Sequence, residues 1–123
     1  RTFIYMVHAN WLLNIVAHLR GKVGAVLIRA VEPIQGIEVM VKNREVENFR
    51  SLTSGPGKLT KALAITKELN GVDVTNRKSE LTVIEGEEGD FEIACSHRIG
   101  VRTDLPEELR FFIKGNKYVS KGS

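Results

Sequence analysis

The sequence predicts an α+β fold, with one domain over residues 1–123 made mainly of antiparallel, curved β-sheet and two short helices packed against it. Two observations lead to this prediction. The first third of the chain alternates apolar stretches with turn-forming residues at hairpin spacing. Two later segments have apolar residues at helical spacing, and short apolar runs near the carboxyl end suit further strands.

The first third predicts a meander of three antiparallel strands. Residues 2–7 alternate between two faces with a period of two, which is typical of a strand. His8–Asn10 has turn-forming composition, and the apolar run Trp11–Ala17 is the second strand. After a second turn, Val23–Ile28 is continuously apolar, which predicts a third strand buried on both faces.

The middle of the chain predicts the two helices. Apolar residues recur at helical spacing over Ile34–Asn43, and the polar stretch Arg44–Arg50 is expected to be a loop. Thr53–Lys58 is typical of a helix start, because Ser54 or Gly55 can cap it and a proline follows. One face of this helix carries Leu59, Ala62, Leu63 and Thr66. The helix is expected to end at Asn70-Gly71.

The last part of the chain predicts strands again. Leu81–Ile84 is interpreted as a strand, Glu85–Asp90 as an acidic turn and Phe91–Ser96 as the returning strand. Leu109–Lys114 is the last strand, closed by Gly115-Asn116. The chain starts abruptly on its most structured segment without a methionine, so we expect it to be a fragment of a longer protein.

Composition excludes several classes of protein. The hydrophobic content of 42% and charged content of 27% are ordinary for a globular domain. The single cysteine, Cys95, excludes an intramolecular disulfide and fits a reducing compartment. No apolar run approaches the roughly 20 residues of a membrane helix, so we expect no membrane association. No His or Cys has a second ligand at useful spacing, so neither a metal nor another cofactor is expected.

Charge is distributed unevenly along the chain. Arg1–Arg29 carries four basic and no acidic residues, whereas Val72–Ser96 carries two basic against seven acidic ones. Such a distribution favours a basic surface that meets a polyanion while the acidic segment stays clear of it. A solvated surface of mixed charge explains the same counts equally well.

Polar groups placed inside the apolar frame of the meander are the first candidate site residues. Tyr5 can be a core aromatic or a stacking platform for a base. Asn14 lies within an apolar run, where its amide satisfies backbone or contacts a ligand. Arg29 ends the third strand and can pair with a carboxylate such as Glu32, or orient an anion or a water molecule. His8 is most simply an exposed turn residue.

The segment SGPGKLTKALAI places Lys58 at a helix start. It is not a Walker motif, because Leu52 stands where glycine is required and Leu59 follows the lysine. It can contact a phosphate of a nucleic-acid backbone through the lysine and free backbone N–H groups, or be a plain helix cap.

Four blocks in the chain, VLIRAVEPIQGIEVM, SGPGKLTKALAI followed by NGVDVT, HRIGV and LRFFIKGNKYVS, resemble the alkyladenine (3-methyladenine) DNA glycosylase family in sequence and order. The resemblance runs from about Thr2 to Ser120. It implies an enzyme of base-excision repair that hydrolyses the N-glycosidic bond of alkylated or deaminated purines flipped out of duplex DNA. It also implies a monofunctional reaction, a protein that acts as a monomer, and a location in the cytoplasm or nucleoid, or in the nucleus of a eukaryote.

The resemblance assigns roles to single residues. Tyr5 matches the tyrosine that stacks on the flipped base, and Arg29 matches the arginine that positions the nucleophilic water. Asn14 matches a substrate-binding asparagine of the pocket, after a one-residue deletion. His8 stands where the family has a tyrosine that wedges into the minor groove.

The remaining matches concern DNA contacts and one missing group. Asn10 lies beside the wedge position, and Gly57 and Lys58 match the phosphate-contacting segment, so all three are predicted to bind DNA. The family's general base is a glutamate in an E-T-E-A-Y-like segment, together with a second aromatic residue and a histidine of the base sandwich. This sequence contains no such segment.

The leading hypothesis is therefore a DNA glycosylase in which Tyr5 and Arg29, on adjoining strands, face one pocket open to DNA. The alternative is a catalytically inactive module on the same scaffold that binds lesions or duplex DNA. A binder of structured RNA is a third interpretation.

Overall fold

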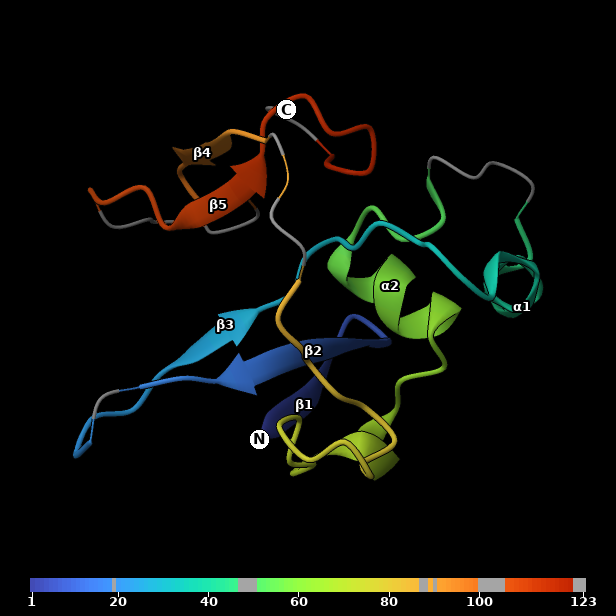
Figure 1. Ribbon diagram of the computed structural model, residues 1–123, viewed down its shortest axis with the longest axis horizontal. Coiled ribbons are helices and arrows are strands. Elements are labelled where there is room, and N and C mark those ends of the chain that lie inside the picture. The colour runs from blue at the N-terminus through green and yellow to red at the C-terminus, as the bar shows by residue number, and fades with distance from the viewer. Residues whose placement is uncertain (19, 47–50, 87–88, 90, 100–105, 121–123) are drawn as a thin grey trace.

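The α+β class is confirmed by a computed structural model, which describes residues 1–18, 20–46, 51–86, 89, 91–99 and 106–120 (Figure 1). Antiparallel strands and two short helices account for its regular structure. The described elements are, in chain order, β1 (Thr2–Val7), β2 (Asn10–Val16), β3 (Ala25–Leu27), α1 (Ile37–Arg44), α2 (Pro56–Ala62), a 3-10 helix (Lys67–Leu69), β4 (Ile93–Ser96) and β5 (Arg110–Ile113).

The predicted meander forms the first sheet, with strand order β1-β2-β3 and both pairs antiparallel. Its register pairs Thr2 with Ile15 and Val7 with Asn10, so one face of the sheet carries Ile4 and Leu13. These two residues are 4% and 5% exposed and pack with Leu59 of α2. The core of the chain therefore lies between the first sheet and α2, the green helix beside β2 in Figure 1.

Helix α2 is shorter than the sequence predicts. Gly55 is its N-cap and Pro56 its first residue, but the helix ends at Ala62. Ala64 adopts a left-handed φ of 53°, and the N–H of Ile65 donates to the carbonyl of Thr60 at 2.8 Å. This is a Schellman ending, usually made by glycine. The chain therefore turns well before Asn70, and Leu63 and Thr66 of the predicted buried face are exposed.

The segment after α2 runs back along the outer edge of β1. The backbone N–H of Thr2 donates to Val72 at 2.9 Å, its hydroxyl donates to Leu69 at 2.5 Å, and the side chain of Asn70 accepts from the Ile4 N–H at 2.7 Å. These bonds occupy backbone groups that an edge strand would otherwise leave unpaired.

The prediction that the third strand is buried on both faces is wrong. Pairing with β2 covers only Ala25–Leu27, and β3 is the edge strand of its sheet. Val23 and Val26 are 101% and 54% exposed. A continuous apolar run identifies a strand but does not say whether another layer covers it.

A second sheet contains only β4 and β5, paired antiparallel with Ile93 opposite Ile113. It lies apart from the first sheet in Figure 1, near the point where β3 leads into the segment before α1. The predicted strand over Leu81–Ile84 is absent, and that segment is irregular. The strand partner of β4 is therefore β5, and not the segment that precedes β4.

Helix α1 begins three residues later than predicted, because Gly36 precedes it with a left-handed φ of 70°. The expected loop Arg44–Arg50 and the expected turn Glu85–Asp90 extend over residues 47–50, 87–88 and 90, which lie outside the described residues. Among the helices of the described residues, none is both long enough and apolar enough to cross a membrane.

Candidate functional site

The tip of the β1–β2 hairpin is a two-residue turn made by His8 and Ala9. Both have left-handed backbone conformations, with φ of 49° and 64°. This is the pattern of a type I′ turn, which usually contains Asn-Gly because side chains with a Cβ are strained there. The side-chain amide of Asn10 donates to the carbonyl of His8 at 3.1 Å and braces the turn. The exposed side chain of His8 is therefore presented at the end of a short, constrained hairpin.

This hairpin tip packs against the first turn of α2. A Cβ added to Gly57 would lie 2.8 Å from Cγ and 3.0 Å from Cβ of Asn10, so only glycine fits that approach. The hydroxyl of Thr60 donates to the carbonyl of Trp11 at 2.7 Å and fixes the helix to β2. Lys58, next to Gly57, is exposed. The structure thus brings the predicted DNA-contacting residues of the hairpin and of the helix start to one place.

The face of the first sheet opposite the core carries Tyr5. The register pairs Tyr5 with Leu12 and Phe3 with Asn14, so these side chains share that face. The ring of Tyr5 lies 5.2 Å from that of Phe3, centroid to centroid, with the planes tilted by 35°. Tyr5 is 38% exposed, so part of its ring is available for stacking on a further group.

Asn14 is buried, with 6% of its surface exposed. Its side-chain amide donates to the carbonyl of Phe3 across the sheet at 3.2 Å. The sequence leaves two interpretations open, an amide that satisfies the backbone or one that contacts a ligand. This bond agrees with the first.

Arg29 follows β3 on the same face as Tyr5. The N–H of Ile28 donates to the carbonyl of Leu13 at 3.0 Å and extends the pairing by one residue, and Ile28 packs on the core. Strand alternation then places Arg29 on the opposite, Tyr5-bearing face. β2 separates β1, which carries Tyr5, from β3, which Arg29 follows, so the two residues do not come from adjoining strands as expected.

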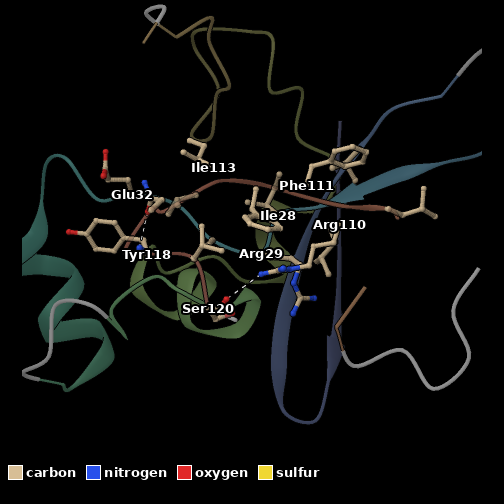
Figure 2. Close-up of a pocket in the computed structure, with 16 residues that line it drawn as sticks. Ile28, Arg29, Glu32, Arg110, Phe111, Ile113, Tyr118 and Ser120 are labelled. Atoms are coloured by element: carbon tan, nitrogen blue, oxygen red, sulfur yellow. Dashed lines mark hydrogen bonds between the residues drawn. The ribbon is translucent and has the colours of Figure 1, made fainter. Parts of the chain in front are cut away.

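The side chain of Arg29 lines a cavity of about 360 Å³ between the end of β3 and the second sheet (Figure 2). Tyr5 is not among the lining residues, so the two side chains do not share this cavity. The walls are largely apolar and come from residues 26–32, 109–113, 116 and 118–120.

Arg110 is a lining residue that the sequence analysis did not single out. It is only 6% exposed, although it is charged. Burial, and next the positive charge of Arg110, lower the pKa of Arg29 from its usual value. Arg110 could have been found in the sequence, because a polar residue inside an apolar segment such as Leu109–Ile113 is a candidate site residue. Asn14 was identified in the same way.

No three His, Cys, Asp or Glu side chains of the described part of the chain are close enough together to hold a metal ion. Cys95 is exposed on β4. The arrangement offers an exposed aromatic ring, a cation in an apolar cavity and a braced hairpin tip.

Comparison with known proteins connects these features to a family. The family model of methylpurine-DNA glycosylase matches residues 1–117. The chain is 42% identical over 123 aligned residues to a protein of Aeropyrum pernix named "Putative 3-methyladenine DNA glycosylase", covering 98% of this chain and 58% of that protein. Proteins with the same name from Mesorhizobium japonicum and Carboxydothermus hydrogenoformans are 40% and 42% identical, with 96% and 97% of this chain and 57% and 61% of theirs covered.

The chain thus spans a little more than half the length of these relatives. The family model covers nearly the whole chain, including both sheets and α2. The chain belongs to the methylpurine-DNA glycosylase family, a family of base-excision repair.

Proposed function

We propose that this protein acts as a monofunctional DNA glycosylase, which hydrolyses the N-glycosidic bond of alkylated or deaminated purines flipped out of duplex DNA. The observation that carries the proposal is the partly exposed ring of Tyr5 on the face of the first sheet opposite the core. Strand alternation past the end of β3 assigns Arg29 to the same side of the sheet. Family membership supports the same reaction class.

Tyr5 would stack on the extruded base. Extrusion of a nucleotide costs a few kcal/mol and is easiest for a damaged or mispaired base. Stacking of a base on an aromatic ring contributes about 1–3 kcal/mol, which offsets much of that cost. The partly exposed ring of Tyr5, supported from one side by Phe3, offers such a surface.

The hairpin tip would enter the space that the base leaves. His8 stands at that tip, on a turn that Asn10 braces and that Gly57 of α2 supports from behind. An imidazole fills less of the gap than the tyrosine of the family, so we expect a weaker wedge. Lys58 lies next to this contact and would pair with a backbone phosphate.

Arg29 would hold the water that attacks the sugar carbon C1′. The water forms the new C–O bond and gives its proton to a carboxylate base, while the purine leaves with the electron pair of the broken N-glycosidic bond. A purine alkylated on N3 or N7 is already cationic and leaves readily. The product is an abasic site, and the resemblance assigns the carboxylate to a glutamate that this sequence does not contain.

The direct test uses the complete polypeptide as the cell makes it and duplexes that contain hypoxanthine, ethenoadenine or an alkylated adenine. Base release followed by alkali should give strand cleavage at the lesion. Salt-sensitive DNA binding with no cleavage on any of these duplexes would instead identify the inactive DNA-binding module. Preferential binding of structured RNA in competition would contradict both.

Tyr5→Ala should weaken binding to lesion duplex about 5- to 150-fold, the equivalent of one lost stacking contact. Tyr5→Phe keeps the ring and should retain most of the affinity. Phe91→Ala is the control, because it removes an exposed aromatic ring that lies outside the first sheet. An equal loss for Phe91→Ala would mean that the ring of Tyr5 has no special contact with the base.

Lys58→Ala should weaken binding to damaged and undamaged duplexes alike and reduce the salt dependence of binding by about one phosphate contact. Lys67→Ala removes an exposed lysine from the 3-10 helix and serves as the control. If the two substitutions had the same effect, only the net charge of the chain would matter.

A further inference from the structure

Arg110 is a buried cation whose orientation is fixed by contacts that include two hydrogen bonds and a cation–π contact with described residues. One terminal nitrogen donates to the hydroxyl of Ser96 at 3.1 Å, and the other donates to the carbonyl of Ser120 at 3.2 Å. The guanidinium also lies over the ring of Phe112, 4.5 Å from its centroid. Ser96 is on β4 and Ser120 follows β5, so Arg110 ties the strand pair to the segment that comes after it.

Arg29 is the contrasting case in the same cavity. Among the described residues, no carboxylate pairs with its guanidinium and no group accepts a hydrogen bond from it. Figure 2 shows the two side chains close together at one end of the cavity, with a dashed line from Arg110 to Ser120 and none from Arg29. One cation is therefore anchored and the other is not.

Two like charges in a cavity with largely apolar walls repel each other more strongly than they would in water. An anchored side chain cannot respond to this repulsion by moving, whereas an untethered one can. Burial first, and the charge of Arg110 second, lower the pKa of Arg29, which is the direction that a neighbouring cation in an apolar cavity produces. Arg29 nevertheless remains protonated near neutral pH, as arginine does in proteins.

We propose that Arg110 is a positioning residue, whose anchored guanidinium directs that of Arg29 away from β5 and toward the group that reacts. This inference rests on the proposed function for the identity of that group, which is the attacking water and the anion that deprotonates it. The placement of Arg29 by Arg110 does not depend on it.

The first experiment measures the placement without any activity. Arg29→Lys introduces an ammonium group whose pKa can be followed by NMR with labelled lysine. When Arg110→Gln is added, which keeps an amide donor for Ser96 and Ser120, this pKa should rise by about one pH unit because a nearby positive charge is gone. Arg110→Lys keeps the charge and should leave the pKa of the introduced ammonium low.

Arg44 offers a matched control. Arg44 is half-buried and donates to the backbone carbonyls of Leu52 at 3.1 Å and Ser51 at 3.0 Å, but it lies on α1 and does not line the cavity. Arg44→Gln should leave the pKa of the introduced ammonium unchanged. The proposal is overturned if Arg110→Gln leaves that pKa unchanged, or if Arg44→Gln raises it equally.

A measurement on Arg29→Lys alone covers the case in which Arg110→Gln does not fold. Raising the salt concentration from about 10 mM to 1 M shortens the screening length from about 30 Å to about 3 Å, so the pKa of the introduced ammonium should rise. A pKa that does not respond to salt would contradict an electrostatic effect of Arg110.

The second experiment concerns catalysis. Arg110→Gln should lower kcat for base release about 10-fold or more with KM changed less than about 3-fold, and Arg110→Lys should recover part of kcat. Urea unfolding of Arg110→Gln separates this effect from lost folding, which would lower the unfolding midpoint as well as kcat. If the unmodified protein releases no base from any lesion, the proposed function is wrong, whereas the NMR titration still decides the role of Arg110.

Discussion

The first sheet buries one apolar face under α2, whereas the second sheet leaves comparable side chains in water. In the first sheet, Ile4 and Leu13 are almost fully buried against Leu59. In the second, Ile93 and Phe111 are 65% and 67% exposed. The core cluster and the partly buried hydrophobic residues packed on it include no residue of β4 or β5.

The second sheet carries a set of directed contacts around one buried cation. The buried guanidinium of Arg110 joins Ser96 to Ser120 and lies over Phe112. The first sheet is therefore stabilised by burial, which is non-directional and large, and the second by directed contacts around one cation. The cavity that Arg29 lines lies where these two kinds of structure meet.

Two aliphatic truncations, one in each region, test most directly whether burial stabilises the first sheet more than the second. Leu59→Ala removes a side chain with 0% exposure and should reduce the free energy of unfolding by about 2–5 kcal/mol. Ile93→Ala removes one of equal size from the second sheet and should cost less than about 1 kcal/mol. Urea unfolding of the two variants measures the difference. Equal losses would mean that the second sheet is buried too, and that the contrast between the sheets is wrong.

The contact between the hairpin and α2 gives the next largest effect. Gly57→Ala would gain up to about 1 kcal/mol from helix propensity if there were room for a methyl group. Because the new Cβ would meet Asn10 at 2.8–3.0 Å, we expect instead a net loss of about 1–3 kcal/mol.

Asn10→Gly in the same chain removes the obstructing atoms and tests this explanation. In thermal or urea unfolding, the double variant should lose less free energy of unfolding than the sum of the losses in the two single variants. Strict additivity would contradict a close contact between the hairpin tip and the helix.

The smallest effect concerns the segment that connects the two sheets. The N–H and hydroxyl of Thr75 donate to one carboxylate oxygen of Asp73 at 3.0 Å and 2.6 Å, and these bonds lower the pKa of Asp73. A lowered pKa stabilises the fold above the ordinary carboxyl value of about 4, and this contribution is lost as the pH falls through the lower native value.

Asp73→Asn should therefore reduce slightly the difference in urea midpoint between pH 6 and pH 3. The change should be small, because Asp73 is fully exposed to solvent. A larger pH dependence in Asp73→Asn than in the unmodified chain would mean that the sign of this contribution is wrong.

Local pattern was sufficient for the elements whose side chains repeat with the geometry of the backbone. The two-residue period of Thr2–Val7 and the turn composition of His8–Asn10 predicted β1 and its hairpin. The sequence pattern did not predict that Leu81–Ile84 is irregular or that α2 ends at Ala62. Both features depend on the tertiary contacts of the segment and not on its own residues. A two-residue period identifies a strand. A short apolar run such as Leu81–Ile84 has no period, so the sequence does not show whether it forms a strand.

The sequence by itself determined the α+β class, the first hairpin and the family, since these depend on periodicity, turn chemistry and ordered motifs within single segments. Only the tertiary structure decided that Arg29 shares a cavity with Arg110, and that Gly57 and Asn10 touch. The members of each pair are separated by dozens of residues, and nothing within either local segment specifies the other. Such contacts arise when sheets and helices pack, so the composition of the cavity follows from the fold as a whole.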